Sequence, residues 1–292
     1  MNRSVKRISL GVAAVVAACT LAIVATLIYQ GRLKPSGDPQ YVALGSSYAA
    51  GLGLGDRALG SPFACQRSVN GYPQQLARAT GLSLVDMTCS GSTAEHVLNG
   101  GQFFQGPQLD AVTSSTQLVT LTSGGNDISY IGDLVAMGYH NRGGFIGKVV
   151  GLLMPAPHLL SERNIAKVEA DIRAAITGIR ERAPSARIVV ATYVAVLPEQ
   201  GTCEALNLTE EQVALMRPVA DQLANATRAA ALAGGAKLVD MATIGKGHDA
   251  CAREPWTNGL SPQHGAAFHP TQAGARATAQ EIAKAAGYEI RL

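Results

Sequence analysis

A serine follows an apolar run early in the chain, in a setting that suits a nucleophile. The run Tyr41-Val42-Ala43-Leu44 leads directly into Gly45-Ser46-Ser47, and a glycine-rich loop comes next. A serine on a sharp turn after a strand exposes its hydroxyl, as in the G-x-S-x-G nucleophile elbow. Such a hydroxyl attacks a carbonyl carbon once a neighbouring base takes its proton. Taken alone, Ser46 and Ser47 are better explained as turn caps, so the assignment depends on the other segments.

Three further segments carry the other groups that acyl transfer requires. In Cys89-Ser90-Gly91-Ser92, the Gly91 N–H can approach a substrate oxygen, and Gly124-Gly125-Asn126-Asp127 offers a side-chain amide. Phe268-His269-Pro270 places an imidazole just before the last predicted helix, where proline suits the first turn. All of these segments fall at predicted strand ends or loops on one side of the sheet. Together they provide a nucleophile, a base and oxyanion donors.

The four segments, in this order, resemble the SGNH/GDSL hydrolase superfamily, in particular its secreted bacterial esterases and lipases. The similarity extends from about Tyr41 to Gly287. The resemblance implies that Ser47 is the nucleophile and His269 the general base. It also implies an oxyanion hole formed by the backbone N–H groups of Ser47 and Gly91 and by the side chain of Asn126.

Two positions depart from the pattern of this superfamily. Ser46 stands where an aspartate usually precedes the nucleophile, and Ala266 stands where an aspartate usually precedes the histidine by three residues. The second change removes the usual carboxylate that orients the imidazole. We therefore expect a Ser47-His269 dyad in which the backbone carbonyl of Ala266 orients the histidine.

Short apolar runs alternate with helical patterns along the rest of the chain. Strands are predicted at residues 41–44, 84–87, 117–122, 187–197 and 237–241, and helices at 72–79, 162–183, 209–233 and 271–286. This alternation predicts a three-layer α/β/α domain with a parallel sheet, and the resemblance implies a five-stranded, flavodoxin-like version. Sites in such sheets lie beyond the carboxyl ends of the strands. Residues 137–160 break the alternation and form either a lid over a hydrophobic pocket or a packed insertion.

The N-terminus predicts a membrane-targeting segment. Arg3, Lys6 and Arg7 precede an uncharged stretch from Ile8 to Tyr29, which at about 1.5 Å per residue can cross a hydrocarbon core of about 30 Å. The flanking positive charges keep the N-terminus inside and send the rest outward.

We expect an uncleaved anchor with an extracytoplasmic domain. A cleaved signal peptide, which would give a secreted protein, and lipid attachment at Cys19 are the alternatives. The expected organisation is an anchor or signal segment at residues 1–30, a linker at 31–40 and a hydrolase domain at 41–292.

Composition and charge restrict the partners. Of the 292 residues, 47% are hydrophobic and 15% are charged, which excludes a largely disordered chain. The net charge of +3 depends on basic residues in or beside the targeting segment, namely Arg3, Lys6, Arg7, Arg32 and Lys34. No basic tract remains elsewhere, so a nucleic-acid partner is not expected. The sequence implies a monomer that acts on a small-molecule or lipid ester, with no metal and no organic cofactor.

Four cysteines lie beyond Cys19. An even number in an exported domain indicates two disulfides, and four cysteines allow three pairings. We favour Cys65 with Cys89 and Cys203 with Cys251, each worth about 3–4 kcal/mol in the chain-entropy model. The segment at residues 247–256 also resembles a disulfide-braced loop of the secreted superfamily members, which implies a structural role.

Three functions fit these residues. The leading one is an esterase, lipase or thioesterase that acts on acyl chains. A carbohydrate deacetylase would use the same catalytic groups, and a catalytically silent binding module would retain only the fold. Ser47, Gly91, Asn126 and His269 are all present, which favours an enzyme over a silent module.

Overall fold

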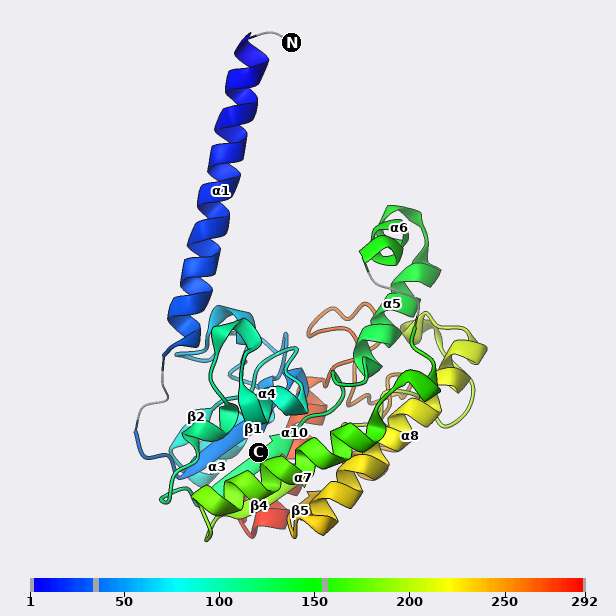
Figure 1. Ribbon diagram of the computed structural model, residues 1–292. Helices are drawn as coiled ribbons and strands as arrows, with labels where there is room; N and C mark the ends of the chain where they lie inside the picture. The colour runs from blue at the N-terminus through cyan, green and yellow to red at the C-terminus, as the bar shows by residue number, and fades with distance from the viewer. Residues whose placement is uncertain (1–2, 34–36, 154–156, 291–292) are drawn as a thin grey trace.

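The computed structural model describes residues 3–33, 37–153 and 157–290. These residues form a five-stranded parallel sheet with helices on both faces, from which a long N-terminal helix, α1 (Arg3–Gly31), projects (Figure 1). The strands lie in the order β2-β1-β3-β4-β5. Their bounds are β1 (Tyr41–Gly45), β2 (Leu84–Asp86), β3 (Leu118–Thr122), β4 (Arg187–Ala191) and β5 (Lys237–Val239). The expected three-layer, five-stranded fold is confirmed.

The helices vary in length from one turn to more than six. Their bounds are α2 (Ser47–Ala50), α3 (Tyr72–Thr80), α4 (Ala94–Asn99), α5 (Tyr130–Arg142), α6 (Gly144–Leu153), α7 (Ile165–Arg182), α8 (Glu210–Ala233), α9 (Met241–Ile244) and α10 (Gln272–Ala286). Two short 3-10 helices matter below, η1 (Phe63–Cys65) and η2 (Gln102–Phe104). The predicted capping box at the start of α8 is present, because Thr209 accepts from the Gln212 N–H and Gln212 accepts from the Thr209 N–H.

The alternation of side chains along each strand divides the core into two layers. Val42 and Leu44 of β1 pack in one cluster with residues of α4, α7 and α8, whereas Tyr41 and Ala43 pack in the other with α3 and α10. Successive side chains of a strand point to opposite faces. A sheet buried on both faces therefore requires the continuous apolar runs that the sequence shows.

The predicted strand at residues 187–197 is wrong in its second half. β4 ends at Ala191, and its neighbour β5 ends at the paired residue, Val239. With no partner strand beyond that point, the apolar chain continues as an irregular segment. Tyr193 in this segment turns towards the end of β1, where its hydroxyl bonds to Ser46 at 2.7 Å. Val194, Val196 and Leu197 of this segment are buried by packing in the two core clusters rather than by strand pairing.

The segment that breaks the alternation, residues 137–160, contains the end of α5 and all of α6. Residues 154–156 of this segment lie outside the described part of the chain. Gly143 and Gly144 make the turn between the helices with φ values of 66° and 65°, a conformation that glycine adopts without strain. A buried ion pair fixes the base of the pair, because Arg163 Nη2 lies 2.6 Å from Asp133 Oδ2. The base of this insertion is packed into the domain, whereas α6 projects from it (Figure 1).

Two disulfides brace the loops around the sheet. Cys65 is joined to Cys89, and Cys203 is joined to Cys251, which is the pairing favoured from the sequence. The first disulfide connects η1 to the loop after β2. The second connects the loop after β4 to the loop after α9.

The N-terminal helix has the length and composition of a membrane span over Val12–Gly31, a property that signal sequences share. Its C-terminal end contacts the domain. Gln30 Oε1 accepts a hydrogen bond from the Phe63 N–H at 2.8 Å, and the buried Gly31 packs against the backbone of η2. A Cβ on Gly31 would lie 2.5 Å from the Phe103 carbonyl oxygen, so glycine permits this close approach.

Candidate active site

Ser47 and His269 meet across 222 residues of sequence. Ser47 begins α2 directly after β1, and its Oγ lies 2.7 Å from His269 Nε2. The turn between strand and helix requires Gly45, which has a φ of 133° and lies against the end of β3. Ser47 is 6% exposed and His269 is 8% exposed. A hydroxyl and an imidazole in hydrogen-bond contact are the pair that nucleophilic acyl transfer uses.

The carbonyl that orients the imidazole is that of Ala267, not that of Ala266. His269 Nδ1 lies 2.7 Å from the Ala267 oxygen, whereas the Ala266 oxygen accepts from the backbone N–H of His269 at 3.2 Å. The expectation for Ala266 was therefore wrong by one residue. Phe268 adopts a φ of 56°, which turns the chain back so that the ring reaches the carbonyl two residues before it. This bond places the proton on Nδ1 and leaves Nε2 as the acceptor from Ser47.

Backbone hydrogen bonds hold the other predicted segments beside β1. The Cys89 N–H donates to the Gly45 oxygen at 3.0 Å, and the Ser46 N–H donates to the Thr122 oxygen at 3.0 Å. The Asn126 side-chain amide donates to the Ser92 oxygen at 2.8 Å. The ends of β1, β2 and β3 are thus joined where the motifs occur, as expected for the carboxyl edge of a parallel sheet.

The geometry of Gly91 and Asn126 suits them to donate to a substrate oxygen. Gly91 is exposed and has a φ of 82°. An amide group carries two N–H donors, so Asn126 can keep its bond to Ser92 and still offer a second hydrogen. Asp127, its neighbour, is occupied elsewhere, because both carboxylate oxygens accept from the Ala94 N–H at the start of α4.

Two positioning residues of the site were not predicted from the sequence. Gln108 is buried, and its side-chain amide makes two hydrogen bonds to the last residue of β1. The amide oxygen accepts from the Gly45 N–H at 2.7 Å, and the amide nitrogen donates to the Gly45 oxygen at 3.1 Å. It also donates to Ser92 Oγ at 2.9 Å. Tyr193 holds Ser46 and stacks on Tyr48 with ring centroids 3.9 Å apart. Neither residue belongs to a local motif, so no sequence signal identified it.

Ser46, which stands before the candidate nucleophile where the superfamily usually has an aspartate, makes a contact between two uncharged hydroxyls. Ser46 is fully buried and its hydroxyl bonds only to the Tyr193 hydroxyl among the described side chains. Burial raises the pKa of Tyr193 well above its ordinary value, so this contact stays uncharged. Tyr48 donates in turn to the Phe268 oxygen at 2.6 Å, which connects the serine turn to the histidine turn.

Burial sets the protonation state of His269, the candidate base. Desolvation lowers the pKa of His269 to about 4, and the hydrogen bond to the Ala267 carbonyl offsets only part of that effect. The imidazole is therefore neutral at pH 7 and able to accept the Ser47 proton. No carboxylate among the described residues hydrogen-bonds to this ring.

The depressed pKa of His269 predicts activity that persists into acid. The value of kcat/KM should fall with an apparent pKa nearer 4 than 6.5, because this ratio reports the base in the free enzyme. Between those two pH values the unfolded chain binds the histidine proton and the folded chain does not, so the free energy of unfolding should also decrease as pH falls through this window. A pH–rate profile on a soluble ester, with circular dichroism as the folding control, measures both. An acid limb centred at 6.5 or above would contradict the burial argument.

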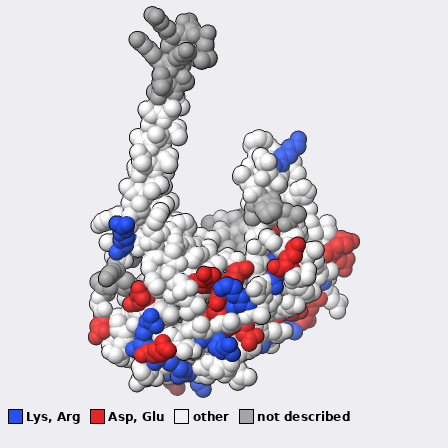
Figure 2. Space-filling model, in the orientation of Figure 1, with Lys and Arg blue, Asp and Glu red and all other residues white. Residues whose placement is uncertain are grey.

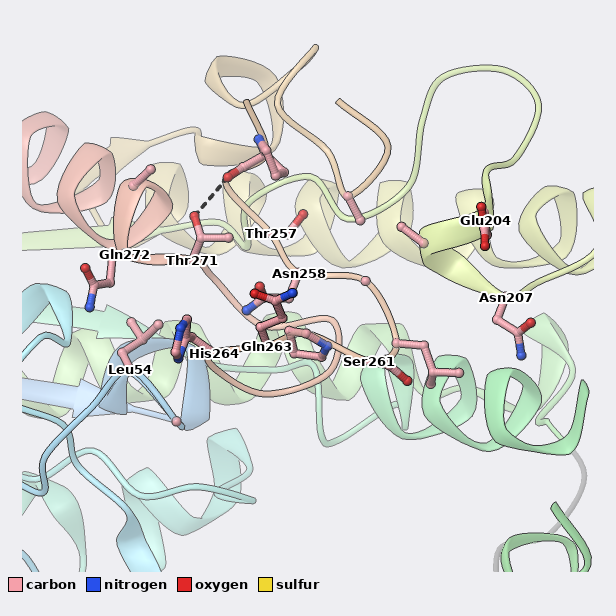
Figure 3. A pocket seen from close by; sticks show the side chains of 18 of the residues that line it. Leu54, Glu204, Asn207, Thr257, Asn258, Ser261, Gln263, His264, Thr271 and Gln272 are labelled. Atoms are coloured by element: carbon pink, nitrogen blue, oxygen red, sulfur yellow. Dashed lines mark hydrogen bonds between the residues drawn. The ribbon is translucent and has the colours of Figure 1, made fainter. Parts of the chain in front are cut away.

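A large cavity of about 1270 Å³ lies near the dyad but does not contain it (Figure 3). Its lining includes residues that precede His269 in the sequence, among them Asn258 and His264. It also includes Thr271 and Gln272, which follow His269. Neither member of the dyad lines this cavity. In the described part of the chain, no group of three or more His, Cys, Asp or Glu side chains could hold a metal ion.

The chain is similar to known proteins along most of its length. Residues 43–277 match the model of the GDSL-like lipase/acylhydrolase family. The chain is 31% identical to lipase 2 of Streptomyces coelicolor over 269 residues, which cover 89% of this chain and 88% of that relative. It is 30% identical to a lipase of Streptomyces rimosus, with 80% and 81% covered.

Solved structures show the same fold. The extracellular lipase of Streptomyces rimosus superposes with a TM-score of 0.64 and 29% identity, covering 84% of this chain and 98% of that one. Phospholipase A1 of Streptomyces albidoflavus superposes with a TM-score of 0.68 and 27% identity, covering 85% and 99%. The chain belongs to the GDSL-like lipase/acylhydrolase family and is an ester hydrolase.

Proposed function

We propose that this protein is an exported, membrane-held lipase or esterase that cleaves acyl esters by a Ser47-His269 dyad. The observation that carries the proposal is the 2.7 Å contact between Ser47 Oγ and His269 Nε2, with Nδ1 bonded to the Ala267 carbonyl. The named relatives are lipases and a phospholipase A1, which favours a lipid acyl ester as the substrate.

The geometry supports a two-step acyl transfer. His269 Nε2 takes the Ser47 proton as Oγ attacks the ester carbonyl carbon, and the oxygen that becomes negative accepts from the N–H groups of Ser47 and Gly91 and from Asn126 Nδ2. The tetrahedral intermediate collapses to an acyl-serine as the histidine gives its proton to the leaving alcohol. Water, activated by the same imidazole, then releases the fatty acid and restores the serine.

The end of α1 supports a retained anchor rather than a cleaved signal peptide. Cleavage after the helix would leave the Phe63 N–H without the Gln30 side chain and would expose the surface that Gly31 covers. A retained helix predicts that the protein stays in the membrane fraction after carbonate extraction, with its mature N-terminus before residue 12. A soluble form that begins near residue 32 would contradict this part of the proposal.

Covalent labelling tests the proposed nucleophile. A fluorophosphonate should label the wild-type chain, and a hydrolysis panel of p-nitrophenyl esters of graded length, acyl-CoA and acetylated sugars defines the substrate. We expect the highest kcat/KM on medium or long acyl esters. A preference for acetylated sugars would favour a deacetylase instead, and a chain that neither labels nor hydrolyses any ester would be a silent module.

The dyad predicts that no aspartate is essential for the chemistry. Asp86, Asp127, Asp240 and Asp249 each have other hydrogen-bond partners in the structure, and none contacts the imidazole. Each Asp→Asn change, made singly, should lower kcat by far less than the factor of about 10⁴ seen when the acid of a triad is neutralised. The measurement is kcat on a soluble ester, with thermal unfolding as the control for folding. A loss near that factor in a folded variant would identify a carboxylate partner of His269.

A further inference from the structure

Two groups of exposed apolar side chains flank the loops of the candidate active site. The first, which we call the aromatic rim, consists of Phe63, Phe103 and Phe104 in η1 and η2, all exposed. The second, which we call the α6 tip, consists of Phe145, Leu152 and Leu153, of which the first two are 82% and 85% exposed. Exposed apolar groups of this size indicate a surface that binds something apolar.

The α6 tip is built as one face of a helix. Its residues are spaced by seven and eight positions, so they lie on the same side of α6. The opposite side of the helix packs on α5, because a Cβ on Gly147 would lie 3.0 Å from the Tyr139 oxygen. The helix contains no acidic residue, and its one charged residue is the exposed Lys148. An apolar stripe with a flanking lysine suits the boundary between lipid tails and headgroups.

The aromatic rim lies at the end of the helix that can span a membrane. Gln30 of α1 bonds to the Phe63 N–H, and Gly31 packs on the backbone of Phe103 and Phe104. In Figure 1, α1 and α6 project from the same side of the sheet domain. In Figure 2, the described part of this side is mostly white, with blue side chains only at the foot of α1 and on α6, whereas most blue and red side chains gather on the body of the domain away from it. The surface of a bilayer that contains α1 would therefore contact both the aromatic rim and the α6 tip.

The aromatic rim and the helix pair that carries the α6 tip both adjoin segments with a candidate oxyanion donor. Gln102, the first residue of η2, donates to the Ser90 oxygen at 2.8 Å, directly beside Gly91. Asn126 lies four residues before the start of α5, which leads into α6. The rim is thus hydrogen-bonded to the segment of Gly91, and the α6 tip is connected through α5 to the segment of Asn126, so a membrane that holds both groups lies close to the candidate donors.

We propose that the aromatic rim and the α6 tip insert into the outer face of the lipid bilayer that anchors α1, so that Ser47 receives its acyl ester directly from the membrane. The delivery of an acyl ester to Ser47 rests on the proposed function, whereas the contact with the bilayer does not. The bilayer is favoured over a second copy of the chain because the rim is continuous with the end of α1, which is itself a candidate membrane span.

Bilayer contact is tested in the full chain reconstituted in phosphatidylcholine/phosphatidylglycerol liposomes. A Phe145→Trp variant should gain fluorescence that brominated phosphatidylcholine quenches. The matched control is Leu232→Trp, at a position that is 83% exposed at the end of α8, away from α1 and α6. Trp256, the one native tryptophan, contributes the same background to both variants. Equal quenching of the two variants, or a blue shift at Phe145→Trp without quenching, would overturn the proposal in favour of a solvent-exposed or self-associating helix.

Substrate delivery is tested with charged variants in the same liposomes. Phe145→Glu combined with Leu152→Glu should lower hydrolysis of a fluorogenic phospholipid in the bilayer by about tenfold or more, since two apolar side chains lose their burial. Hydrolysis of soluble p-nitrophenyl acetate should not change, and Leu232→Glu should change neither rate. Equal losses on both esters, or no loss on the lipid, would overturn the proposal. If the wild type cleaves neither ester, the proposed function fails, while quenching still decides the membrane contact.

Discussion

Replacing Ser47 by alanine should lower kcat on a soluble ester by at least about 10⁴-fold, because the acyl-enzyme can no longer form. His269→Ala should cause a loss of similar size, since without the imidazole the hydroxyl keeps its proton. The 2.7 Å contact makes the two residues one functional unit, so the double variant should be no slower than either single variant. Steady-state kinetics with fluorophosphonate labelling measure all three.

The neighbouring serine provides a matched control for this experiment. Ser46→Ala removes a buried hydroxyl of the same turn that bonds to Tyr193 and not to the histidine. This variant should keep its labelling and most of its turnover, whereas Ser47→Ala should lose both. The reverse pattern would assign the nucleophile to Ser46, and wild-type turnover in Ser47→Ala would refute the site.

Replacing Asp133 by alanine should destabilise the domain by about 3–5 kcal/mol, because it leaves a buried guanidinium without a counter-charge. The Asp133 carboxylate lies 2.6 Å from Arg163 Nη2 and also accepts from the His158 N–H at 3.1 Å. Arg163 is buried and donates further to the oxygens of Ile128 and His158. These bonds fix the start of α5 to the segment before α7. Urea unfolding of the detergent-solubilised chain, followed by near-ultraviolet circular dichroism, measures the loss.

A surface ion pair of the same chain serves as the comparison. Asp171→Ala removes the partner of Lys167 at 2.6 Å, but the lysine is about half exposed, so we expect a change below about 1 kcal/mol. The double change Asp133→Leu with Arg163→Met should recover much of the stability, since it removes both buried charges. Equal effects of Asp133→Ala and Asp171→Ala would show that the pair contributes no more than an exposed one.

Local sequence determined the elements and the order of the motifs. The short apolar run at residues 41–44 predicted a buried strand, because a sheet covered on both faces needs both sides of each strand to be apolar. The alternation of such runs with amphipathic patterns then predicted the parallel sheet, and parallel strands place their carboxyl ends on one edge. Ser47, Gly91, Asn126 and His269 follow strands or precede a helix, and the resemblance of their four segments to the SGNH/GDSL superfamily implied their roles.

Contacts between distant segments were decided only by the tertiary structure. The end of β4 depends on where β5 stops, so the sequence of residues 187–197 could not show that pairing ceases at Ala191. The carbonyl that orients His269 depends on the turn at Phe268, whose φ of 56° no propensity predicts. For this reason the sequence predicted the carbonyl of Ala266, whereas the structure has that of Ala267. Gln108 and Tyr193 reach the site from 63 and 147 residues away in sequence. A hydrogen bond over that separation leaves no local pattern, because only the packing of the whole sheet brings its two partners within 3 Å of each other.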